Sequence, residues 1–378
     1  MDMTVSFIFF LYVLLVLFLV VGWDKAVVSK QLKGPDITSP RITVLVPVRN
    51  EEDRIHHLIE DLRQQSIQDI EVIIIDDHSV DRTREVCEAA INGDVRFHVS
   101  KATGHGKKLA LTQGVKAASG VLIATTDADC RVGPLWLKEL TREFSDPTAM
   151  MIFGGVRFAG HSWFESVQAM EFAALIGVGG STAAWHLPTM CNGASLAYRK
   201  IAFEHVGGYN DNIQIPSGDD EFLMRKVNAA FSNSVRFCSA KDAVVVTRAS
   251  NSIRALFYQR VRWAGKWRHD RNVTSGLLAP IIFAFHAAVV SLPYLVVTGM
   301  VQPSIAATAL LSKALVECFF LRKLRITLRF NWSWSGFAVL QLIYSYYVII
   351  VAICAQFMAF EWKGRRMKST VSGTQPLV

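Results

Sequence analysis

The hydrophobic positions along the chain divide it into a membrane-like start, a globular middle and a second membrane-like part. Residues 4–21 form an uninterrupted apolar run that is long enough to cross a bilayer as a helix. No basic segment precedes this run and no small-residue cleavage site follows it, which favours a retained anchor over a cleaved signal peptide. Three further apolar stretches come late in the chain, at residues 277–301, 304–321 and 335–360. We therefore expect an anchor at the start and a membrane bundle at the end.

The globular middle alternates between strand-like and helix-like patterns. Strand-like runs occupy residues 42–48, 71–76, 94–99 and 121–129, and helix-like runs lie between them at 52–64, 81–91 and 106–118. This alternation predicts an α/β domain with a mostly parallel, doubly wound, Rossmann-like sheet. The whole chain then has five parts: an N-terminal transmembrane anchor, this domain, an amphipathic interface helix, a C-terminal transmembrane bundle and a basic tail. In order they span residues 1–24, 41–251, 252–272, 277–362 and 363–378.

Composition and charge place this domain on one side of a membrane. The mean hydropathy of +0.28 and the apolar content of 51% are high for a soluble enzyme, and the net charge is +8. Lys and Arg cluster beside the apolar stretches, which favours anionic lipid headgroups over nucleic acid as their partner. The same clusters predict an integral protein of a bacterial-type plasma membrane with its globular domain in the cytoplasm. The tail is basic too, so either one late stretch does not cross fully or the tail departs from this rule.

The candidate metal- and ligand-binding residues lie where the predicted strands end, and parallel sheets bind their ligands at these ends. Asp127 and Asp129 lie at i and i+2 after the last predicted strand, so in an extended segment both would project to one side and could hold a hard divalent cation. Asp76 and Asp77 could contact a nucleotide base or ribose, or they could simply cap the following helix. No GxGxxG or GxxxxGK[ST] segment is present, which argues against a dinucleotide cofactor and a P-loop ATPase.

Three consecutive carboxylates, at residues 219–221, begin a helix-like run. Three like charges side by side repel one another, so the arrangement needs a physical reason. A helix cap, a metal site and a catalytic base are the alternatives, and capping alone requires only one of the three. The six cysteines form no CxxC pair and are expected to be free thiols.

Taken together, these segments resemble the family-2 glycosyltransferases, inverting enzymes with a GT-A fold, over about residues 41–271. PVRNEE resembles the P-x-x-N-E motif, DDHS the D-D-x-S motif with His78 where many members carry Gly, GKKLAL the G-K-x-x-A segment, and DAD the metal-binding D-x-D. SGDDEFL resembles the segment with the catalytic base. QRVRW matches the Q-x-x-R-W motif of membrane-bound polysaccharide synthases such as those for hyaluronan, chitin and cellulose.

The resemblance implies roles for individual residues. Asp127 and Asp129 would hold Mg²⁺ or Mn²⁺ on the donor diphosphate, and Asp220, beside Asp219, would be the general base. Its like-charged neighbours would raise its proton affinity. Gln259, Arg262 and Trp263 share one helical face that would turn towards the active site. The residues expected to bind the nucleotide or substrate are Pro47, Asn50, Glu51, Asp76, Asp77, Lys107, Asp127, Gln259, Arg262 and Trp263.

The implied reaction moves a sugar from a nucleotide-sugar donor, most often a UDP-sugar in this family, to a lipid or lipid-linked acceptor at the membrane. A processive polysaccharide synthase is the alternative within the family, and a non-catalytic membrane scaffold is the alternative outside it. Lys313 and Glu317, at i and i+4 in an apolar stretch, are expected to neutralise each other rather than line a channel.

Overall fold

The structure is a computed structural model that describes residues 1–29, 41–160, 162–215, 217–266, 273–358, 360–362 and 365–367. The last part of the predicted interface helix, residues 267–272, and the predicted basic tail apart from residues 365–367 lie outside the described residues.

A mixed sheet of seven strands forms the centre of the globular domain, in the order β3-β2-β1-β4-β7-β5-β8. Its strands are β1 (Ile42–Val48), β2 (Ile70–Asp76), β3 (Phe97–Lys101), β4 (Leu122–Thr125), β5 (Met151–Gly154), β7 (Leu196–Arg199) and β8 (Val235–Cys238). All neighbouring pairs are parallel except the two that β7 makes with β4 and β5. The predicted α/β fold with a mostly parallel sheet is therefore confirmed.

Amphipathic helices cover this sheet. In α2, Ile55, Leu58, Ile59 and Leu62 are buried at helical spacing, which gives one apolar stripe towards the strands. The surrounding elements are α2 (Ile55–Arg63), α3 (Thr83–Ile91), α4 (Lys107–Ala117), α5 (Trp136–Arg142), α7 (Lys200–His205), α8 (Asp219–Ala230) and the short 3-10 helices η2 (Glu143–Ser145), η3 (Gly193–Ser195), η4 (Asn210–Asn212) and η5 (Lys241–Ala243). Two small sheets pair β6 (Val156–Ala159) with β9 (Val245–Arg248) and β10 (Phe360–Trp362) with β11 (Arg365–Met367).

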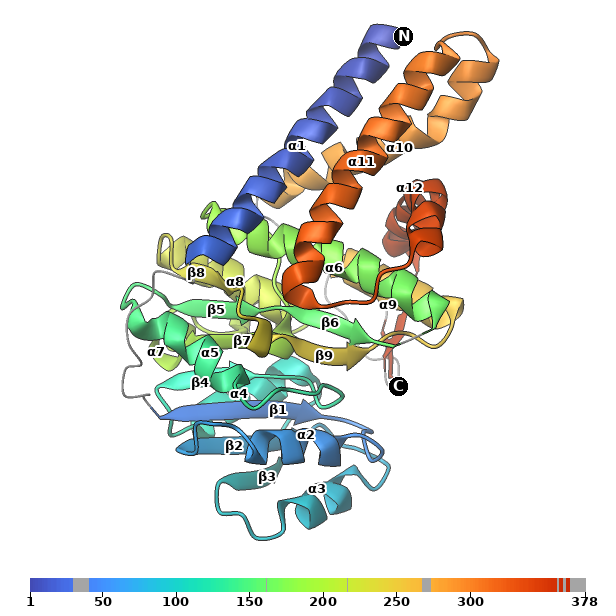
Figure 1. The fold of residues 1–378 in the computed structure, drawn as a ribbon. Coiled ribbons are helices and arrows are strands. Elements are labelled where there is room, and N and C mark those ends of the chain that lie inside the picture. Colours follow the sequence, from blue (N-terminus) through green and yellow to red (C-terminus); the bar gives the residue numbers. More distant parts are fainter. Residues whose placement is uncertain are drawn as a thin grey trace.

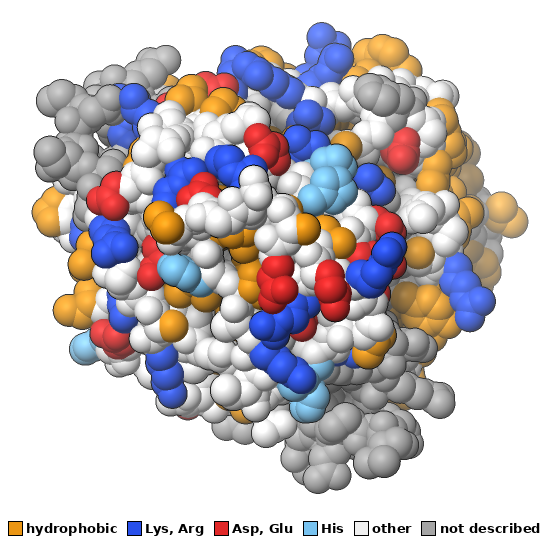
Figure 2. Space-filling view, turned by 90° about the horizontal axis from the view of Figure 1, so that it is seen from below, with side chains coloured by type: hydrophobic (Ala, Val, Ile, Leu, Met, Phe, Trp, Pro, Cys, Tyr) orange, Lys and Arg blue, Asp and Glu red, His pale blue; other side chains and the backbone are white. Residues whose placement is uncertain are grey.

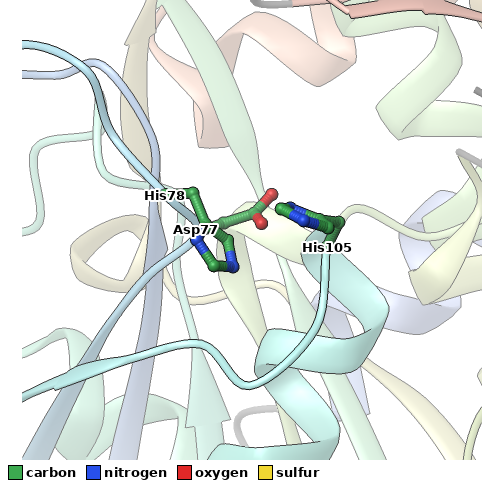
Figure 3. Close-up of side chains that lie close together, drawn as sticks. All are labelled: Asp77, His78 and His105. Carbon is green, nitrogen blue, oxygen red and sulfur yellow. The ribbon is translucent and has the colours of Figure 1, made fainter. Parts of the chain in front are cut away.

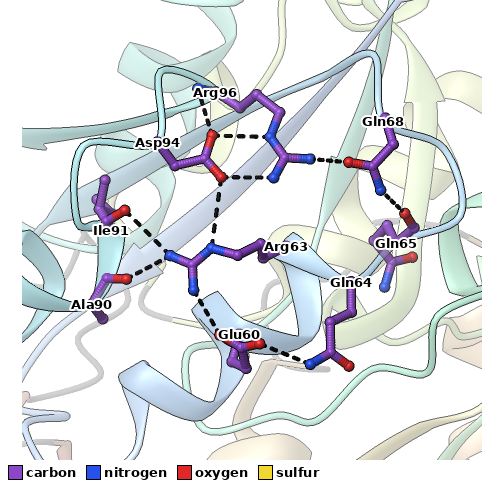
Figure 4. Close-up of polar contacts among 9 residues, drawn as sticks. All are labelled: Glu60, Arg63, Gln64, Gln65, Gln68, Ala90, Ile91, Asp94 and Arg96. Atoms are coloured by element: carbon purple, nitrogen blue, oxygen red, sulfur yellow. Dashed lines mark hydrogen bonds and ion pairs between the residues drawn. The ribbon is translucent and has the colours of Figure 1, made fainter.

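A polar cluster fastens the outer edge of the sheet (Figure 4). Asp94 accepts two hydrogen bonds from the guanidinium of Arg96, at 3.0 and 2.6 Å, and one from its backbone N–H at 3.1 Å. Arg63 of α2 donates to the carbonyl of Ala90 at 2.6 Å and pairs with Asp94 at 3.6 Å. The turn closed by Asp94 explains why β3 starts at Phe97, three residues later than the apolar pattern predicted.

Four described helices are long and apolar enough to cross a membrane. They are α1 (Asp2–Ser29), α10 (Val273–Val297), α11 (Pro303–Leu328) and α12 (Trp334–Phe357), in agreement with the predicted anchor and bundle. Figure 1 shows α1 and α11 running side by side away from the sheet, whereas α12 is seen nearly end-on beside α9 (Ile253–Gly265). The opposite face of the domain carries interspersed acidic and basic side chains (Figure 2), as expected of a surface in contact with water.

The long helix α6 (Trp163–Ala184) joins the domain to the bundle, and the sequence pattern did not reveal it. It contacts α1, α11 and α12 on one side and β6 and β8 on the other. A Cβ at Gly177 would lie 2.4 Å from Leu324 of α11, and one at Gly180 would lie 2.9 Å from Trp23 of α1. The helix is apolar on all sides because both the sheet and the bundle cover it, so no amphipathic period marks it.

A buried ion pair ties the bundle together. Lys313 is 2.9 Å from Glu317, as the i, i+4 spacing predicted, and only 2% of its side chain is exposed. Its ammonium also donates to Gln341 of α12 at 2.9 Å, and the hydroxyl of Tyr12 in α1 donates to Glu317. Charges placed within apolar helices are thus satisfied by partners from three helices.

Candidate active site

A cavity of about 570 Å³ lies where the parallel strands end, between the sheet and the helices that adjoin the bundle. It is lined by most of the predicted site residues: Pro47, Asp77, Lys107, Asp127, Asp129, Asp219, Asp220, Gln259, Arg262 and Trp263. The carboxylates that follow β4 and those that begin α8 therefore share one opening.

Asn50, Glu51 and Asp76 are not among the residues that line this cavity, because they shape the loop after β2. Asp76 accepts hydrogen bonds from the backbone N–H of Ser79 at 3.0 Å and from its hydroxyl at 2.6 Å. The backbone N–H of Asn50 donates to the same hydroxyl at 3.0 Å, and that of Glu51 donates to the Thr83 hydroxyl at 2.7 Å. In this structure the side chain of Asp76 therefore holds the turn that presents Asp77.

The DAD segment is a turn, not the extended segment that the sequence pattern suggested. Strand β4 ends at Thr125, and the backbone N–H of Cys130 donates to the carbonyl of Asp127 at 3.0 Å. The expectation that Asp127 and Asp129 project together from a strand is therefore wrong in its local geometry. Both residues nevertheless line the cavity, and their carboxylates are the hard oxygen donors that suit Mg²⁺ or Mn²⁺.

Lys107, the first residue of α4, connects the two acidic groups. Its ammonium lies 2.7 Å from Asp127 and 3.1 Å from Asp219. A Cβ at Gly193 would lie 3.3 Å from this ammonium and 3.3 Å from the Asp219 carboxylate. The absence of a side chain at Gly193 therefore leaves space for the Lys107 ammonium and the Asp219 carboxylate to pair.

Asp220 is buried, and this burial raises its pKa to about 6, with the charge of Asp219 as the second cause. The repulsion was predicted from the sequence, whereas the burial follows from the tertiary structure. Asp219 differs, since the attraction of Lys107 and Lys108 outweighs its burial and lowers its pKa. Asp220 accepts a hydrogen bond from the backbone N–H of Gly193 at 2.9 Å, which fixes its carboxylate in the cavity wall.

The acidic run does not cap its helix. The N-cap of α8 is Gly218, whose φ of 78° is left-handed, and no side chain caps the first turn. The sequence-based interpretation of Asp219 or Asp220 as an N-cap is therefore wrong. Glu221 pairs with Lys266 at 2.5 Å and with Arg225 at 3.3 Å. Because each flanking carboxylate has a cationic partner, three adjacent acids can be buried together.

Helix α9 presents Gln259, Arg262, Trp263 and Lys266 to the cavity, as the helical spacing predicted. Burial lowers the pKa of Arg262, while Asp127, Asp219 and Asp220 favour its charged form. The guanidinium therefore lies near the acidic residues of the cavity, where its fixed positive charge offsets theirs.

Several cavity residues were missed because they come from α6, which the sequence pattern did not reveal, or from α12, which it marked only as apolar. Glu171 of α6 forms a buried ion pair with Arg260, whose guanidinium also lies 4.2 Å from the Trp263 ring centre. Tyr344 and Tyr347 of α12 line the same wall, and the Tyr347 hydroxyl is buried without a hydrogen-bond partner among the described residues. The one sequence signal for this wall of the cavity was Glu171, a charged residue within a largely apolar segment.

Comparison with known proteins finds similarity to glycosyltransferases in both sequence and structure. Residues 43–207 match the family described as Glycosyl transferase family 2. An uncharacterized glycosyltransferase of Bacillus subtilis (strain 168), EpsJ, is 34% identical over 104 residues, which cover 28% of this chain and 30% of that protein. The poly-beta-1,6-N-acetyl-D-glucosamine synthase of Staphylococcus aureus (strain MSSA476) is 28% identical over 245 residues, or 61% of this chain and 56% of the synthase. The chain thus spans between 30% and 56% of the length of these relatives.

Among solved structures, the mannosyltransferase PcManGT from Pyrobaculum calidifontis, in complex with GDP-Man and Mn²⁺, superposes with a TM-score of 0.58. It is 17% identical, and the match covers 94% of this chain and 99% of that one. This similarity shows that the arrangement of the sheet and the helices is shared.

Proposed function

We propose that the chain is a glycosyltransferase, because residues 43–207 match Glycosyl transferase family 2, and that it transfers a sugar, with inversion, from a nucleotide-sugar donor to a membrane lipid or lipid-linked acceptor. One observation carries the proposal. The cavity that holds Asp127, Asp129 and Asp220 continues to apolar side chains of the membrane bundle, which are Ile282 and Phe283 of α10 and Val351 and Ala355 of α12.

Asp220 is the proposed general base. Inversion requires one group to take the proton from the acceptor hydroxyl as its oxygen attacks the anomeric carbon. A carboxyl with a pKa of about 6 is deprotonated at neutral pH and still accepts a proton readily. Each carboxylate oxygen accepts one backbone hydrogen bond, from the N–H of Gly193 at 2.9 Å and from that of Glu221 at 2.8 Å, which holds the group in place and leaves a second lone pair on each oxygen for the hydroxyl proton.

Asp127 and Asp129 are the proposed ligands of Mg²⁺ or Mn²⁺, since their carboxylates border the cavity and are hard oxygen donors. When bound, the ion would offset the charge of the departing nucleoside diphosphate. Lys107 and Arg262 supply positive charge to the same half of the cavity from α4 and α9. Asp77 and the loop held by Asp76 and Asn50 are the proposed contacts of the nucleoside.

The acceptor is proposed to approach from the bundle. Its lipid part would lie against the apolar residues of α10 and α12, and its head would reach Asp220 past Trp263. An indole ring with one face on the Arg260 guanidinium can offer its other face to a sugar or a lipid head.

The direct test uses the full chain in lipid nanodiscs made from bacterial membrane lipids, with Mn²⁺ and a panel of UDP- and GDP-sugars. We expect release of nucleoside diphosphate from one donor, together with a lipid whose mass increases by one sugar residue. Asp211→Asn, at an exposed carboxylate that pairs with Lys226 outside the cavity, serves as the matched control and should behave as the wild type. Release of nucleotide with sugar found only on soluble molecules would contradict the lipid acceptor.

A processive polysaccharide synthase is the second candidate, favoured by the similarity to the staphylococcal synthase and by the QRVRW segment. The same reaction separates the two candidates. A single new lipid species supports one transfer, whereas a ladder of products of increasing length supports polymerisation.

A further inference from the structure

Two histidines and an aspartate converge at the nucleotide end of the cavity, apart from the DAD turn (Figure 3). Asp77 follows β2, His78 is its neighbour, and His105 precedes α4. Each side chain offers one ligand atom, and these three atoms lie within 4.8 Å of one another. Within the described residues, no other group of three or more His, Cys, Asp or Glu side chains has its ligand atoms this close together.

The backbone at His78 is held in an uncommon conformation. Its φ of 57° lies in the left-handed region, which residues with a Cβ rarely adopt. The guanidinium of Arg49 donates to the carbonyls of Asp77 and His78, at 2.7 Å each, and so fixes the chain there. Such local strain often accompanies a functional position, and here it turns an imidazole towards Asp77.

The side chains of the group lie close to one another and to the backbone of α4. The Nε2 atom of His78 is buried and has no hydrogen-bond partner within the described part of the chain. The ring centres of His78 and His105 lie 4.1 Å apart, and the backbone N–H of Gly106 donates to Asp77 at 3.0 Å. An unsatisfied buried nitrogen is unfavourable, and a ligand at this place would satisfy it.

The donor set determines which ion fits. Neutral imidazole nitrogen suits Zn²⁺, Co²⁺, Ni²⁺ and Cu²⁺, whereas Mg²⁺ and Mn²⁺ prefer sites made of oxygen. An ion with bonds of about 2.0–2.2 Å needs its ligands closer together than the present limit of 4.8 Å. His105 is exposed, so rotation of its side chain can close this gap without moving the sheet.

We propose that Asp77, His78 and His105 form a second cation site, selective for Zn²⁺ and similar ions over Mg²⁺ and Mn²⁺, and that an ion at this site prevents the nucleotide donor from using Asp77. The competition with the donor rests on the role proposed above for Asp77 in donor binding, whereas the cation site does not. A cation there makes the enzyme sensitive to Zn²⁺ at a place separate from Asp127 and Asp129.

Binding is tested on the full chain in detergent, stripped of metal by a chelator and titrated with Co²⁺ alone, which reports imidazole coordination by its visible absorption. We expect one equivalent in the wild type, displaced by Zn²⁺ and not by Mg²⁺. His78→Ala and His105→Ala should each weaken binding roughly tenfold or more. His98→Ala, at an exposed histidine of the adjacent strand β3, is the matched control and should bind as the wild type. Unchanged Co²⁺ affinity in both site variants, with circular dichroism like that of the wild type, would overturn the site.

The competition is tested separately, by donor binding at fixed Mn²⁺ with increasing Zn²⁺. In the wild type, Zn²⁺ should raise the apparent Kd of the donor, and His105→Ala should require roughly tenfold more Zn²⁺ for the same effect. Equal sensitivity of the two proteins would show that Zn²⁺ acts elsewhere, for instance at Asp127 and Asp129. Because Co²⁺ binding is measured without donor, failure of the proposed glycosyl transfer would not be mistaken for failure of this site.

Discussion

Asp219 and Asp220 are neighbours in sequence with opposite electrostatic surroundings. Asp219 lies 3.1 Å from the Lys107 ammonium, and its pKa is lowered. Asp220 faces no cation at that distance among the described ion pairs, and burial together with Asp219 raises its pKa to about 6. Two adjacent carboxyls thus have pKa values shifted in opposite directions, which fits the proposed division into a charge partner and a base.

This difference predicts the pH dependence of transfer. The carboxylate of Asp220 is the active form and exists above its pKa, so the rate should rise with pH and reach half its plateau near pH 6. Asp219→Asn removes the repulsion and frees the charge of Lys107, and both changes should move the midpoint to lower pH. The measurement is the single-turnover rate against pH for both proteins. A midpoint that stays in place or moves upward in the variant would contradict this assignment of the base.

At the residue scale, the sequence predicted which acids lie in the site but not their burial or their charged partners. The acids of DAD and of the α8 run line the cavity as expected. The motif gave no sign that Glu221 would be neutralised by Lys266, because that lysine comes from a different element 45 positions away. Contacts between residues distant in sequence set burial and pKa, and a local pattern does not contain them.

At the scale of elements, helices α6 and α9 are joined by the Glu171–Arg260 pair, whose side chains are 9% and 5% exposed. Arg260→Met should lower the free energy of unfolding by about 3–5 kcal/mol, because it leaves a buried carboxylate without its partner. The double variant Arg260→Met, Glu171→Leu should recover most of the loss. Thermal unfolding in detergent, followed by circular dichroism, measures both. A double variant no more stable than the single one would show that the pair is not the cause.

Helix α12 forms the bundle side of the cavity, which predicts a variant that separates donor from acceptor. Ala355→Trp would place an indole among the apolar lining residues, and we expect transfer to lipid to fall on the order of 10²-fold through misplacement of the acceptor. Donor binding should be unchanged. Ile353→Trp, at a 49% exposed position of the same helix, is the control. Loss of donor binding in Ala355→Trp would show that the substitution acts on the donor and not on the acceptor.

The elements that the sequence predicted were those with a strong period. Strands β1, β2 and β4 and helices α2 to α4 fall at or near their expected positions. Helix α6 was not predicted because both the sheet and the bundle cover it, which removes the amphipathic period. Strands β5, β7 and β8 have only four residues each, too few for a period of their own. Strand β4 is equally short and was predicted only as part of the longer run 121–129.

At the scale of the whole molecule, α12 runs across the end of the bundle and not alongside α1 and α11 (Figure 1). The hairpin of β10 and β11 follows it, and β10 contacts α9, beside the globular domain. From this arrangement we predict that one of the late apolar stretches does not cross, which is the first of the two alternatives for the basic tail.

The topology is tested by cysteine labelling in intact cells with a reagent that does not cross membranes. Met3→Cys and Val297→Cys, at positions 89% and 86% exposed, should react from outside. Val95→Cys, in the globular domain and 85% exposed, should react only after the membrane is opened. The parent protein gives the background of the six native cysteines. Labelling of Val95→Cys in intact cells would reverse the proposed orientation.

The central claim is that one cavity brings a carboxylate base to a lipid acceptor opposite the nucleotide-binding acids. Its most direct test is single-turnover transfer of a radiolabelled sugar into lipid by Asp220→Asn, with donor binding measured in the same sample. We predict that the rate falls by about 10²–10⁴-fold, the usual contribution of a general base, and that the donor Kd stays within about twofold of the wild type. Transfer by Asp220→Asn at the wild-type rate would contradict the account.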